Sequence, residues 1–395
     1  MDRICDALDC TGCSACRSVC PKACITMAPD AEGFQRPVID TSRCIDCGRC
    51  VKACPTNNVV TGDKALAFMA WSLDDGILEK CASGGVFDAL AAIVIEYGGV
   101  VFGAAVEPST QVLRHVSAED TDGIAPMRLS KYYQSEVRDT YTEVKRLLLE
   151  ERWVLYTGTP CQIAGLYASL GERLSKNPHL LTMEVLCHGV TSKQAVDSYV
   201  ASKERRLHQR VTGIKFRTKD GPNGWEDSSH AMLQIESGHD VSTFIADKSD
   251  TFMVSYGVSL FMRESCYRCK YCSDIRVADY MAGDFWGVGD DRADDAQRLK
   301  GVSLLLVSSE KGQALLPSLE DSLYLEAIEL NEATPRNSAL YRPTTRNNSR
   351  EVFFSRVKDE DFDDLVHRLL WKVFLKRWAK SHLPSRVIDL IRRSR

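Results

Sequence analysis

A duplicated run of cysteines near the start of the chain constrains its fold more than any other feature. Each run has the spacing C-x2-C-x2-C-x3-C followed by proline, and the two runs consist of Cys10, Cys13, Cys16 and Cys20, and of Cys44, Cys47, Cys50 and Cys54. A cubane iron–sulfur cluster needs four thiolates on four irons, and a loop with a ligand at every third residue reaches three of its corners. The fourth ligand has to come from elsewhere in the chain.

Two clusters that exchange their fourth ligands meet this requirement. In the bacterial ferredoxin arrangement the last cysteine of each run binds the other cluster. We therefore predict one [4Fe–4S] cluster on Cys10, Cys13, Cys16 and Cys54, and a second on Cys44, Cys47, Cys50 and Cys20. Zinc sites use two spaced pairs of ligands and match these runs less well. Cys5 and Cys24 fall outside the pattern, and we interpret both as small buried apolar residues.

The remaining sequence divides into a small domain, a large domain and a tail. Residues 1–60 contain ten of the 16 cysteines, and a segment this short needs a cofactor to hold it together. We predict a ferredoxin-like domain there, a larger domain over 65–355 and a basic tail over 356–395. In the larger domain, strands predicted at 65–72, 100–106, 153–157, 180–186 and 302–307 alternate with helices predicted at 86–97, 143–151, 162–170 and 192–206. This alternation is typical of an α/β domain with a largely parallel sheet, α+β when the chain is taken as a whole. Short alternating runs with glycine turns predict a β-rich insertion over 211–245.

A third group of cysteines lies in the larger domain. Cys266, Cys269 and Cys272 have the spacing of three corners of another cubane, and zinc is the alternative because no Cys-Pro pair marks the run. Cys161 and Cys187 each follow a predicted strand, where a ligand is held rigidly. Cys81 is interpreted as a loop thiol.

Two glycine-containing turns are candidate phosphate sites. Ser83-Gly84-Gly85 precedes a predicted helix, and Gly158-Thr159-Pro160 opens another. The amides at a helix N-terminus favour an anion, although such turns also serve as plain helix starts. Neither turn has the G-x-G-x-x-G pattern of an ordinary nicotinamide site. Gly283–Gly287 follows Cys272 closely enough to share its pocket, with core packing as the alternative for Phe285 and Trp286.

Charge and hydropathy limit the partners. The net charge of −4 gives no indication of a nucleic-acid partner, yet Trp371–Arg395 carries eight basic residues and one acidic residue. This amphipathic pattern, broken by Pro384, suits an anionic membrane face or an acidic partner, and packing on its own domain is the alternative. We find no apolar run of about 18 residues and no apolar core of a signal peptide near Met1. The sequence therefore predicts a cytoplasmic metalloprotein, with peripheral contact to the inner membrane face through the tail.

Six further motifs, taken in order, resemble those of the coenzyme F420 hydrogenase/dehydrogenase beta-subunit family. The similarity is to the bacterial form with an N-terminal two-cluster ferredoxin domain, and it extends from about residue 65 to residue 355. The motifs are SGGVFDALA (Ser83–Ala91), SKYYQS (Ser130–Ser135), LYTGTPCQIAGL (Leu155–Leu166), EVLCHGVTS (Glu184–Ser192), IKFRTKDGPNGW (Ile214–Trp225) and RESCYRCKYCSDIRVADYMAGDFWG (Arg263–Gly287).

The resemblance implies an FAD-binding domain with its own iron–sulfur cluster. It places flavin contacts near Ser83, Gly84, Gly85, Gly158, Thr159, Pro160 and Gly283. It favours Cys161, Cys187, Cys266 and Cys269 as ligands of the third [4Fe–4S] cluster. The sequence departs from the family pattern in carrying Cys272, which leaves the fourth ligand open, and in having Cys81 where serine is more common. The polar groups expected around the flavin are Lys131, His188, either a proton donor or a core histidine, and Asp284.

These features together predict an iron–sulfur flavoprotein oxidoreductase. Clusters carry single electrons, whereas a flavin exchanges one electron or a hydride. We expect electrons to pass between [4Fe–4S] clusters and FAD, with coenzyme F420 or an organic substrate at the flavin and ferredoxin or another redox protein as partner. The alternative is a ferredoxin-fed FAD reductase, or an electron-transfer subunit, that serves a surface-polysaccharide or other pathway without F420.

Overall fold

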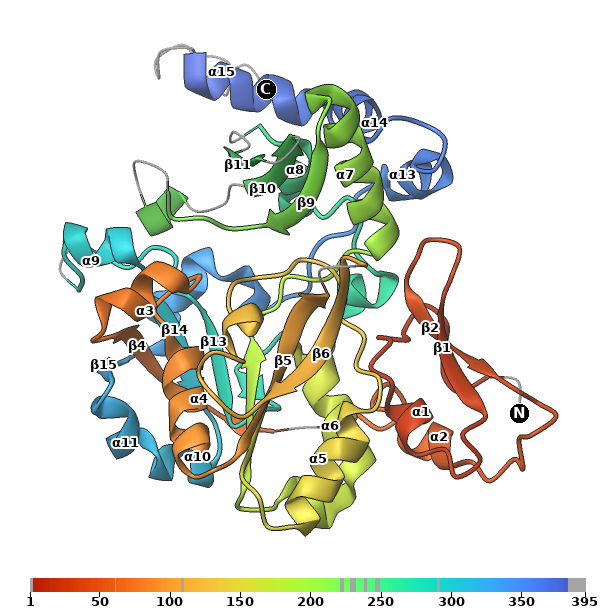
Figure 1. Ribbon diagram of the computed structural model, residues 1–395, viewed down its shortest axis with the longest axis vertical. Coiled ribbons are helices and arrows are strands. Elements are labelled where there is room, and N and C mark those ends of the chain that lie inside the picture. Colours follow the sequence, from red (N-terminus) through yellow and green to blue (C-terminus); the bar gives the residue numbers. More distant parts are fainter. Residues whose placement is uncertain are drawn as a thin grey trace.

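The computed structural model describes residues 3–60, 62–107, 110–220, 224–227, 232–237, 240–245, 249–289 and 292–382. A small N-terminal domain lies beside a larger body, in which a wide sheet is surrounded by helices (Figure 1). A second, smaller sheet lies above the wide one and is covered by the C-terminal helices.

The N-terminal domain contains little regular structure. Strands β1 (Ile25–Pro29) and β2 (Gln35–Ile39) form an antiparallel pair, and each cysteine run contains one short helix, α1 (Ala15–Ser18) or α2 (Arg49–Lys52). Its buried core consists of Ile4, Cys16, Cys24, Ile25, Cys50 and Cys54. Because four of these six side chains are cysteines, apolar burial alone holds this domain weakly.

The wide sheet has eight strands in the order β15-β4-β14-β13-β8-β7-β5-β6. Their bounds are β4 (Leu66–Ser72), β5 (Val100–Glu107), β6 (Val112–Ala118), β7 (Val154–Gly158), β8 (Leu180–Val185), β13 (Tyr280–Asp284), β14 (Ser303–Val307) and β15 (Leu323–Ile328). The five strands predicted from the sequence are confirmed. The predicted largely parallel sheet is wrong, because three pairings are parallel and four are antiparallel. Strands β6, β14 and β15 run opposite to the other five strands, and the sequence pattern did not indicate β6 and β15 at all.

Helices cover both faces of this sheet. Alternate residues of β5, β7 and β8 pack against α4 (Val86–Glu96) on one face, and the residues between them pack against α5 (Thr140–Leu149) and α6 (Pro160–Ser175) on the other. Strands buried on both faces have nearly continuous apolar runs, which is why they were recognisable in the sequence. The remaining short elements around the sheet are β3 (Asp63–Lys64), α3 (Asp75–Lys80), η1 (Ala125–Met127), η3 (Glu264–Arg268), β12 (Ile275–Arg276), α9 (Asp295–Lys300), α10 (Glu310–Ala314), α11 (Leu316–Glu320), α12 (Leu330–Ala333), η4 (Thr334–Arg336) and η5 (Ser338–Leu340).

The predicted β-rich insertion is confirmed as a three-stranded antiparallel sheet. It consists of β9 (Arg210–Lys215), β10 (Met232–Ser237) and β11 (Asp240–Ile245), with η2 (Gly224–Asp227) in the connection before β10. A phenylalanine-rich core joins this sheet to α7 (Lys193–Leu207), α8 (Thr251–Gly257), α13 (Arg350–Arg356) and α14 (Phe362–Leu369). Residues 221–223, within the IKFRTKDGPNGW motif, lie outside the described residues.

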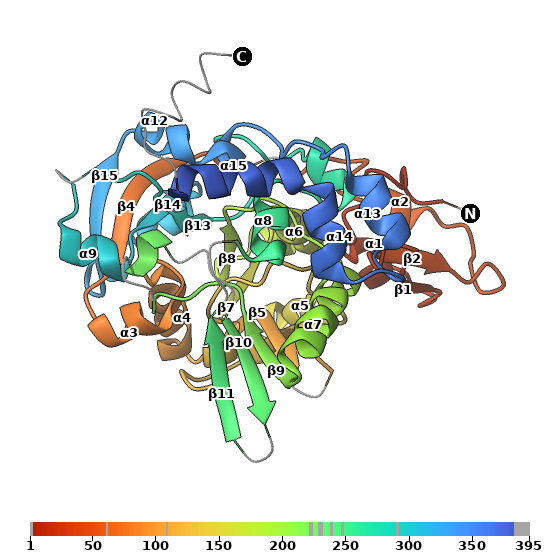
Figure 2. The same ribbon diagram turned by 90° about the horizontal axis from the view of Figure 1, so that it is seen from above.

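The first part of the C-terminal segment packs in this second core, and the part that follows lies on the outside of the molecule. Of the tail predicted over 356–395, Phe362, Leu365 and Val366 are fully buried in the core. Helix α15 (Trp371–His382) then runs along the outside of the molecule (Figure 2). Residues 383–395, including Pro384, lie outside the described residues. Among the helices that the structure describes, none has both the length and the apolar character needed to cross a bilayer.

Candidate functional site

Two cavities in the N-terminal domain are lined by cysteines. The first cysteine cavity, of about 310 Å³, is lined by Cys5, Cys10, Cys13, Cys16 and Cys54. The second cysteine cavity, of about 360 Å³, is lined by Cys20, Cys24, Cys44, Cys47 and Cys50. Each cavity thus contains three cysteines of one run and the last cysteine of the other. The structure brings together the two ligand sets that the spacing predicts.

Cys5 and Cys24, interpreted as structural from the sequence, lie in the walls of these cavities. Cys24 is buried, and its Sγ lies 3.3 Å from the Sγ of Cys20. Cys5 shares a hydrogen bond with Cys10, which lowers the pKa of Cys10 to about 5. Each cavity therefore offers five thiols, one more than a cubane requires.

The backbone of both cysteine runs is shaped to receive an anion. Gly12 and Ser14 adopt positive φ values of 68° and 66°, and Asp46 and Gly48 adopt 49° and 69° at the equivalent positions of the second run. Alternation between right- and left-handed residues turns successive backbone N–H groups toward one point, a concave arrangement found at many iron–sulfur sites. Both runs have this unusual backbone, and an anionic cluster requires such converging N–H groups.

A third cysteine cavity, of about 910 Å³, lies where the N-terminal domain meets the wide sheet. The cysteines that line it are Cys161, Cys187, Cys266, Cys269 and Cys272. Cys161 lies at the start of α6, directly after β7, and Cys187 follows β8. Because β7 and β8 are parallel neighbours, their carboxyl ends meet at one edge of the sheet and bring the two cysteines together. All five candidates from the sequence therefore surround one cavity.

Four of the five thiols of the third cysteine cavity resist ionisation, whereas a hydrogen bond with Cys269 lowers the pKa of Cys272. Burial raises the pKa of Cys161 to about 11 and that of Cys266 to about 12. Bound iron supplies the positive charge that such thiols need to become thiolates. Within the described residues, no three His, Cys, Asp or Glu side chains converge on one point as a single metal ion requires. Cysteines placed around a cavity suit a cluster instead, since each thiolate binds a different iron.

A larger cavity, of about 2370 Å³, opens beside the third cysteine cavity. We call it the cofactor cavity. Eight of the ten sequence-predicted flavin-site and catalytic residues line it: Ser83, Gly85, Lys131, Gly158, Thr159, His188, Gly283 and Asp284. Pro160 instead lines the third cysteine cavity. Gly84 lines neither; its N–H donates to Ser303 Oγ at 2.8 Å, and a Cβ there would lie 2.4 Å from the carbonyl oxygen of Ala70.

The cavities adjoin one another and share wall residues. Thr159, Cys161, Cys187 and His188 line both the third cysteine cavity and the cofactor cavity. Thr11, Pro55 and Thr56 line both the first and the third cysteine cavities. A path of adjoining cavities therefore leads from the cysteine runs of the N-terminal domain to the cofactor cavity.

Lys131 and His188, which line the cofactor cavity, have lowered pKa values. Burial lowers the pKa of Lys131 to about 7, and its Nζ donates to the carbonyl oxygens of Pro126 at 2.9 Å and Arg128 at 2.5 Å. Burial also lowers the pKa of His188, whose Nε2 lies 3.2 Å from Ser259 Oγ. A neutral histidine is therefore favoured where the cofactor cavity and the third cysteine cavity meet.

Asp284 is held by two neighbours. Its Oδ2 forms an ion pair with Arg217, and its Oδ1 accepts a 2.7 Å hydrogen bond from Trp225 Nε1. Trp225 and Trp286 stack with ring centroids 4.8 Å apart, while Phe285 is buried in the core. Because both oxygens of Asp284 have partners, its carboxylate is better suited to positioning Arg217 at the cavity wall than to proton transfer.

No sequence pattern assigned a role to Arg217, His115 or Arg263. His115, on β6, is buried in the wall of the cofactor cavity, and its Nε2–H donates to the carbonyl oxygen of Thr157 at 2.9 Å. Burial lowers its pKa to about 4, so the ring is neutral. Strand β6 was not predicted, so no signal pointed to His115. Arg217 and Arg263 lie within recognised motifs, but their roles depend on contacts with distant residues.

This arrangement defines an iron–sulfur electron-transfer protein in which a small dicluster domain is docked on an α/β domain. Residues 9–58 match the family model described as "4Fe-4S dicluster domain". Residues 151–333 match the model for the C-terminal part of "Coenzyme F420 hydrogenase/dehydrogenase, beta subunit". Residues 151–333 thus form a domain of this beta-subunit family of redox proteins, and a dicluster domain precedes it in the chain.

Curated relatives match short segments. "NADH-quinone oxidoreductase subunit I 2" of Geobacter metallireducens is 44% identical over 64 residues, which are 15% of this chain and 49% of that protein. "NADH-quinone oxidoreductase subunit I" of Pelobacter propionicus is 39% identical over 61 residues, 13% of this chain and 32% of that protein. The chain thus spans half or less of the length of these relatives.

One of the solved structures similar to this chain covers most of it. It is a chain of the "F420-reducing [NiFe] hydrogenase complex from Methanosarcina barkeri", in a xenon-derivatised form. The alignment covers 80% of this chain and 94% of that chain, with 18% sequence identity and a TM-score of 0.45.

Proposed function

We propose that this protein passes electrons between [4Fe–4S] clusters and FAD, with coenzyme F420 or an organic molecule as the two-electron reactant at the flavin. The observation that carries the proposal is the wall shared by the third cysteine cavity and the cofactor cavity, in which Cys161 and Cys187 face both. A flavin is the group that joins one-electron carriers to a hydride donor or acceptor.

The ligands proposed for the clusters follow the three cysteine cavities. The first cluster is assigned to Cys10, Cys13, Cys16 and Cys54, and the second to Cys20, Cys44, Cys47 and Cys50. The third is assigned to four of Cys161, Cys187, Cys266, Cys269 and Cys272. Since the first and third cavities share wall residues, the first cluster is the one that exchanges electrons with the third.

The residues of the cofactor cavity suit a dinucleotide such as FAD. Helices α4 and α6 both begin at its wall, at Gly85 and Thr159. Backbone N–H groups at helix N-termini bind phosphate, and two such ends suit a pyrophosphate. Lys131, partly protonated near neutral pH, adds positive charge for an anionic ligand. His188 lies next to the third cysteine cavity, where it can donate a hydrogen bond to a bound ring.

Quantifying the cofactors and then reducing the flavin tests this function. The full chain is purified anaerobically, and iron and flavin are measured. Three clusters require about twelve irons per chain and two require about eight. Flavin absorbance is then followed after adding reduced F420 or, separately, reduced ferredoxin. Bleaching by reduced F420 supports the deazaflavin reaction, bleaching by ferredoxin alone supports the ferredoxin-fed alternative, and absence of flavin overturns both.

One surface supports peripheral attachment to a membrane. Trp371, Leu375 and Trp378 lie along one stripe of α15 and are 55%, 55% and 54% exposed. Lysines flank this stripe on the same helix, and the opposite side packs on the core through Val373 and Phe374. An exposed aromatic stripe beside positive charge suits an anionic lipid surface. We propose this contact together with a cytoplasmic location; binding to an acidic protein instead of vesicles would contradict it.

A further inference from the structure

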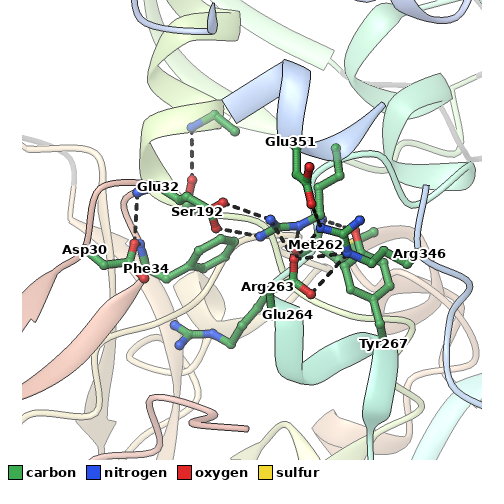
Figure 3. Close-up of polar contacts among 12 residues, drawn as sticks. Asp30, Glu32, Phe34, Ser192, Met262, Arg263, Glu264, Tyr267, Arg346 and Glu351 are labelled. Atoms are coloured by element: carbon green, nitrogen blue, oxygen red, sulfur yellow. Dashed lines mark hydrogen bonds and ion pairs between the residues drawn. The ribbon is translucent and has the colours of Figure 1, made fainter. Parts of the chain in front are cut away.

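Arg263 is a buried cation that forms no ion pair in the described part of the chain. Its side chain is 1% exposed, and it is one of three arginines among the largest fully buried side chains. The other two have carboxylate partners: Arg276 pairs with Glu184, and Arg350 pairs with Glu32 at 2.6 Å and Glu264 at 2.9 Å. Figure 3 shows Glu32 and Glu264 turned away from the Arg263 guanidinium.

Among the residues that the structure describes, those that contact this guanidinium are neutral. Its Nη1 donates to the carbonyl oxygens of Gln35 at 3.2 Å and Cys10 at 3.3 Å, and its Nη2 donates to Gln134 Oε1. The Phe34 ring centroid lies 4.8 Å from Cζ. Nε is buried, and no described residue accepts a hydrogen bond from it. An isolated buried charge costs so much free energy that proteins almost always provide a counter-charge.

Arg263 lies between two cysteine cavities. It lines the third, where its own carbonyl oxygen accepts a 2.9 Å hydrogen bond from the N–H of Cys266. Its guanidinium contacts the carbonyl oxygen of Cys10, a residue of the first cavity.

The N-terminal domain makes room for this guanidinium at Gly12. Gly12 has φ +68°, and a Cβ there would lie 2.9 Å from Arg263 Nη2 and 2.8 Å from the carbonyl oxygen of Gln35. Any larger residue would therefore displace the guanidinium from the first cysteine run. The turn that holds the candidate ligands Cys10 and Cys13 is thus also shaped to admit the arginine.

We propose that Arg263 is the counter-cation shared by the first and the third clusters, and that it sets the reduction potentials of both. This rests on the cluster assignments of the proposed function. A cubane with four thiolates is anionic, and one-electron reduction adds a negative charge without forming or breaking a bond. A fixed positive charge between the two clusters favours the reduced form of each. It also lowers the electrostatic repulsion between the clusters when either of them carries the added electron.

Redox titration of the full chain tests the proposal. Clusters are reduced stepwise with a chemical reductant in the presence of mediators, and their populations are followed by electron paramagnetic resonance. In R263M we expect the equilibrium constant for one-electron reduction of the first and third clusters to fall about tenfold, which corresponds to a potential lower by about 59 mV. The second cluster is the internal reference, since Arg263 does not line its cavity. R263K keeps the charge and should retain most of the wild-type potential.

R350K is the matched control for local disturbance, because it alters a neighbouring buried guanidinium but keeps the positive charge that Glu32 and Glu264 balance. We expect it to leave all three potentials unchanged. Wild-type potentials in R263M with full iron content would overturn the proposal. If R263M loses iron, R263Q, which keeps a hydrogen-bond donor, is titrated instead. Loss of iron from both neutral variants but not from R263K supports the counter-charge, and loss from all three overturns it. A wild-type chain without a third cluster would instead contradict the proposed function.

Discussion

Trp225 donates its indole N–H to the carboxylate of Asp284 across 2.7 Å, on the side opposite the ion pair with Arg217. The two contacts fix a carboxylate at the end of β13, in the wall of the cofactor cavity. The arrangement presents a buried guanidinium to the cavity with its charge already balanced. A substitution of Asp284 should therefore change both the stability of the fold and ligand binding in the cofactor cavity.

Replacing Asp284 by Asn should destabilise the fold, because the substitution leaves the buried Arg217 without its anion. Breaking a buried ion pair costs about 3 kcal/mol or more in the free energy of unfolding. Denaturant unfolding of D284N against wild type measures this loss. The double variant D284N/R217M should recover part of it, since it removes both charges. Equal stability of D284N and wild type would contradict the role of the pair.

Replacing Cys266 by Ala should remove one cluster and leave the dicluster domain intact. We expect iron to fall from about twelve to about eight per chain. C81S is the control, because Cys81 lines only the cofactor cavity and its iron content should match wild type. C269S and C272S, measured in the same way, identify which of these two thiols completes the third cluster. Unchanged iron in C266A would refute the ligand assignment.

Lys131 should make stability depend on pH. Its pKa is about 7 in the folded chain, against an ordinary value near 10.5. Between these values the unfolded chain binds more protons than the folded one, so the free energy of unfolding rises with pH across this window. K131M removes this contribution. Between pH 7 and pH 9 the free energy of unfolding should therefore rise more in wild type than in K131M. An equal change in the two proteins would count against a lowered pKa of Lys131.

Replacing Gly84 by Ala should displace the start of α4. The new Cβ would lie 2.4 Å from the carbonyl oxygen of Ala70, in the adjoining strand β4. We expect a loss of about 1–3 kcal/mol in the free energy of unfolding and weaker flavin retention. G257A is the matched control: Gly257 ends α8 and has open space around it, so its stability should change by less than about 1 kcal/mol. Equal effects in the two variants would disprove the close contact.

The exposed stripe of α15 should determine binding to anionic vesicles. A triple variant with Trp371, Leu375 and Trp378 replaced by Ser should lose most of its co-sedimentation with vesicles that contain an anionic phospholipid. Because these side chains are more than half exposed, thermal stability should stay close to wild type. Zwitterionic vesicles serve as the control surface. Retained co-sedimentation of the folded variant would exclude the stripe as the contact.

The sequence predicted local chemistry better than the direction of strands. Cysteine spacing is dictated by the size of a cluster, and the structure places all 13 candidate cysteines around three cavities. The apolar runs of β5, β7 and β8 identified the parallel half of the sheet. Strand β13 extends this half through a parallel pairing with β8, and β14, β4 and β15 follow in antiparallel pairings that no local pattern specifies. The position of Arg263 is likewise determined by Gln35 and Gln134, far from it in the chain.

The ion pairs of Arg350 have a consequence for how the chain delivers electrons. Arg350 belongs to the large body, Glu32 to the N-terminal domain, and the guanidinium that joins them is 2% exposed. Separating the two domains would strip Arg350 of one of its two carboxylate partners and leave Glu32 without its cation, which favours a fixed N-terminal domain over a swinging carrier on a tether. Any cofactors held in the adjoining cavities keep fixed spacings. Transfer between them would then be governed by distance and driving force, and would be insensitive to the viscosity of the medium.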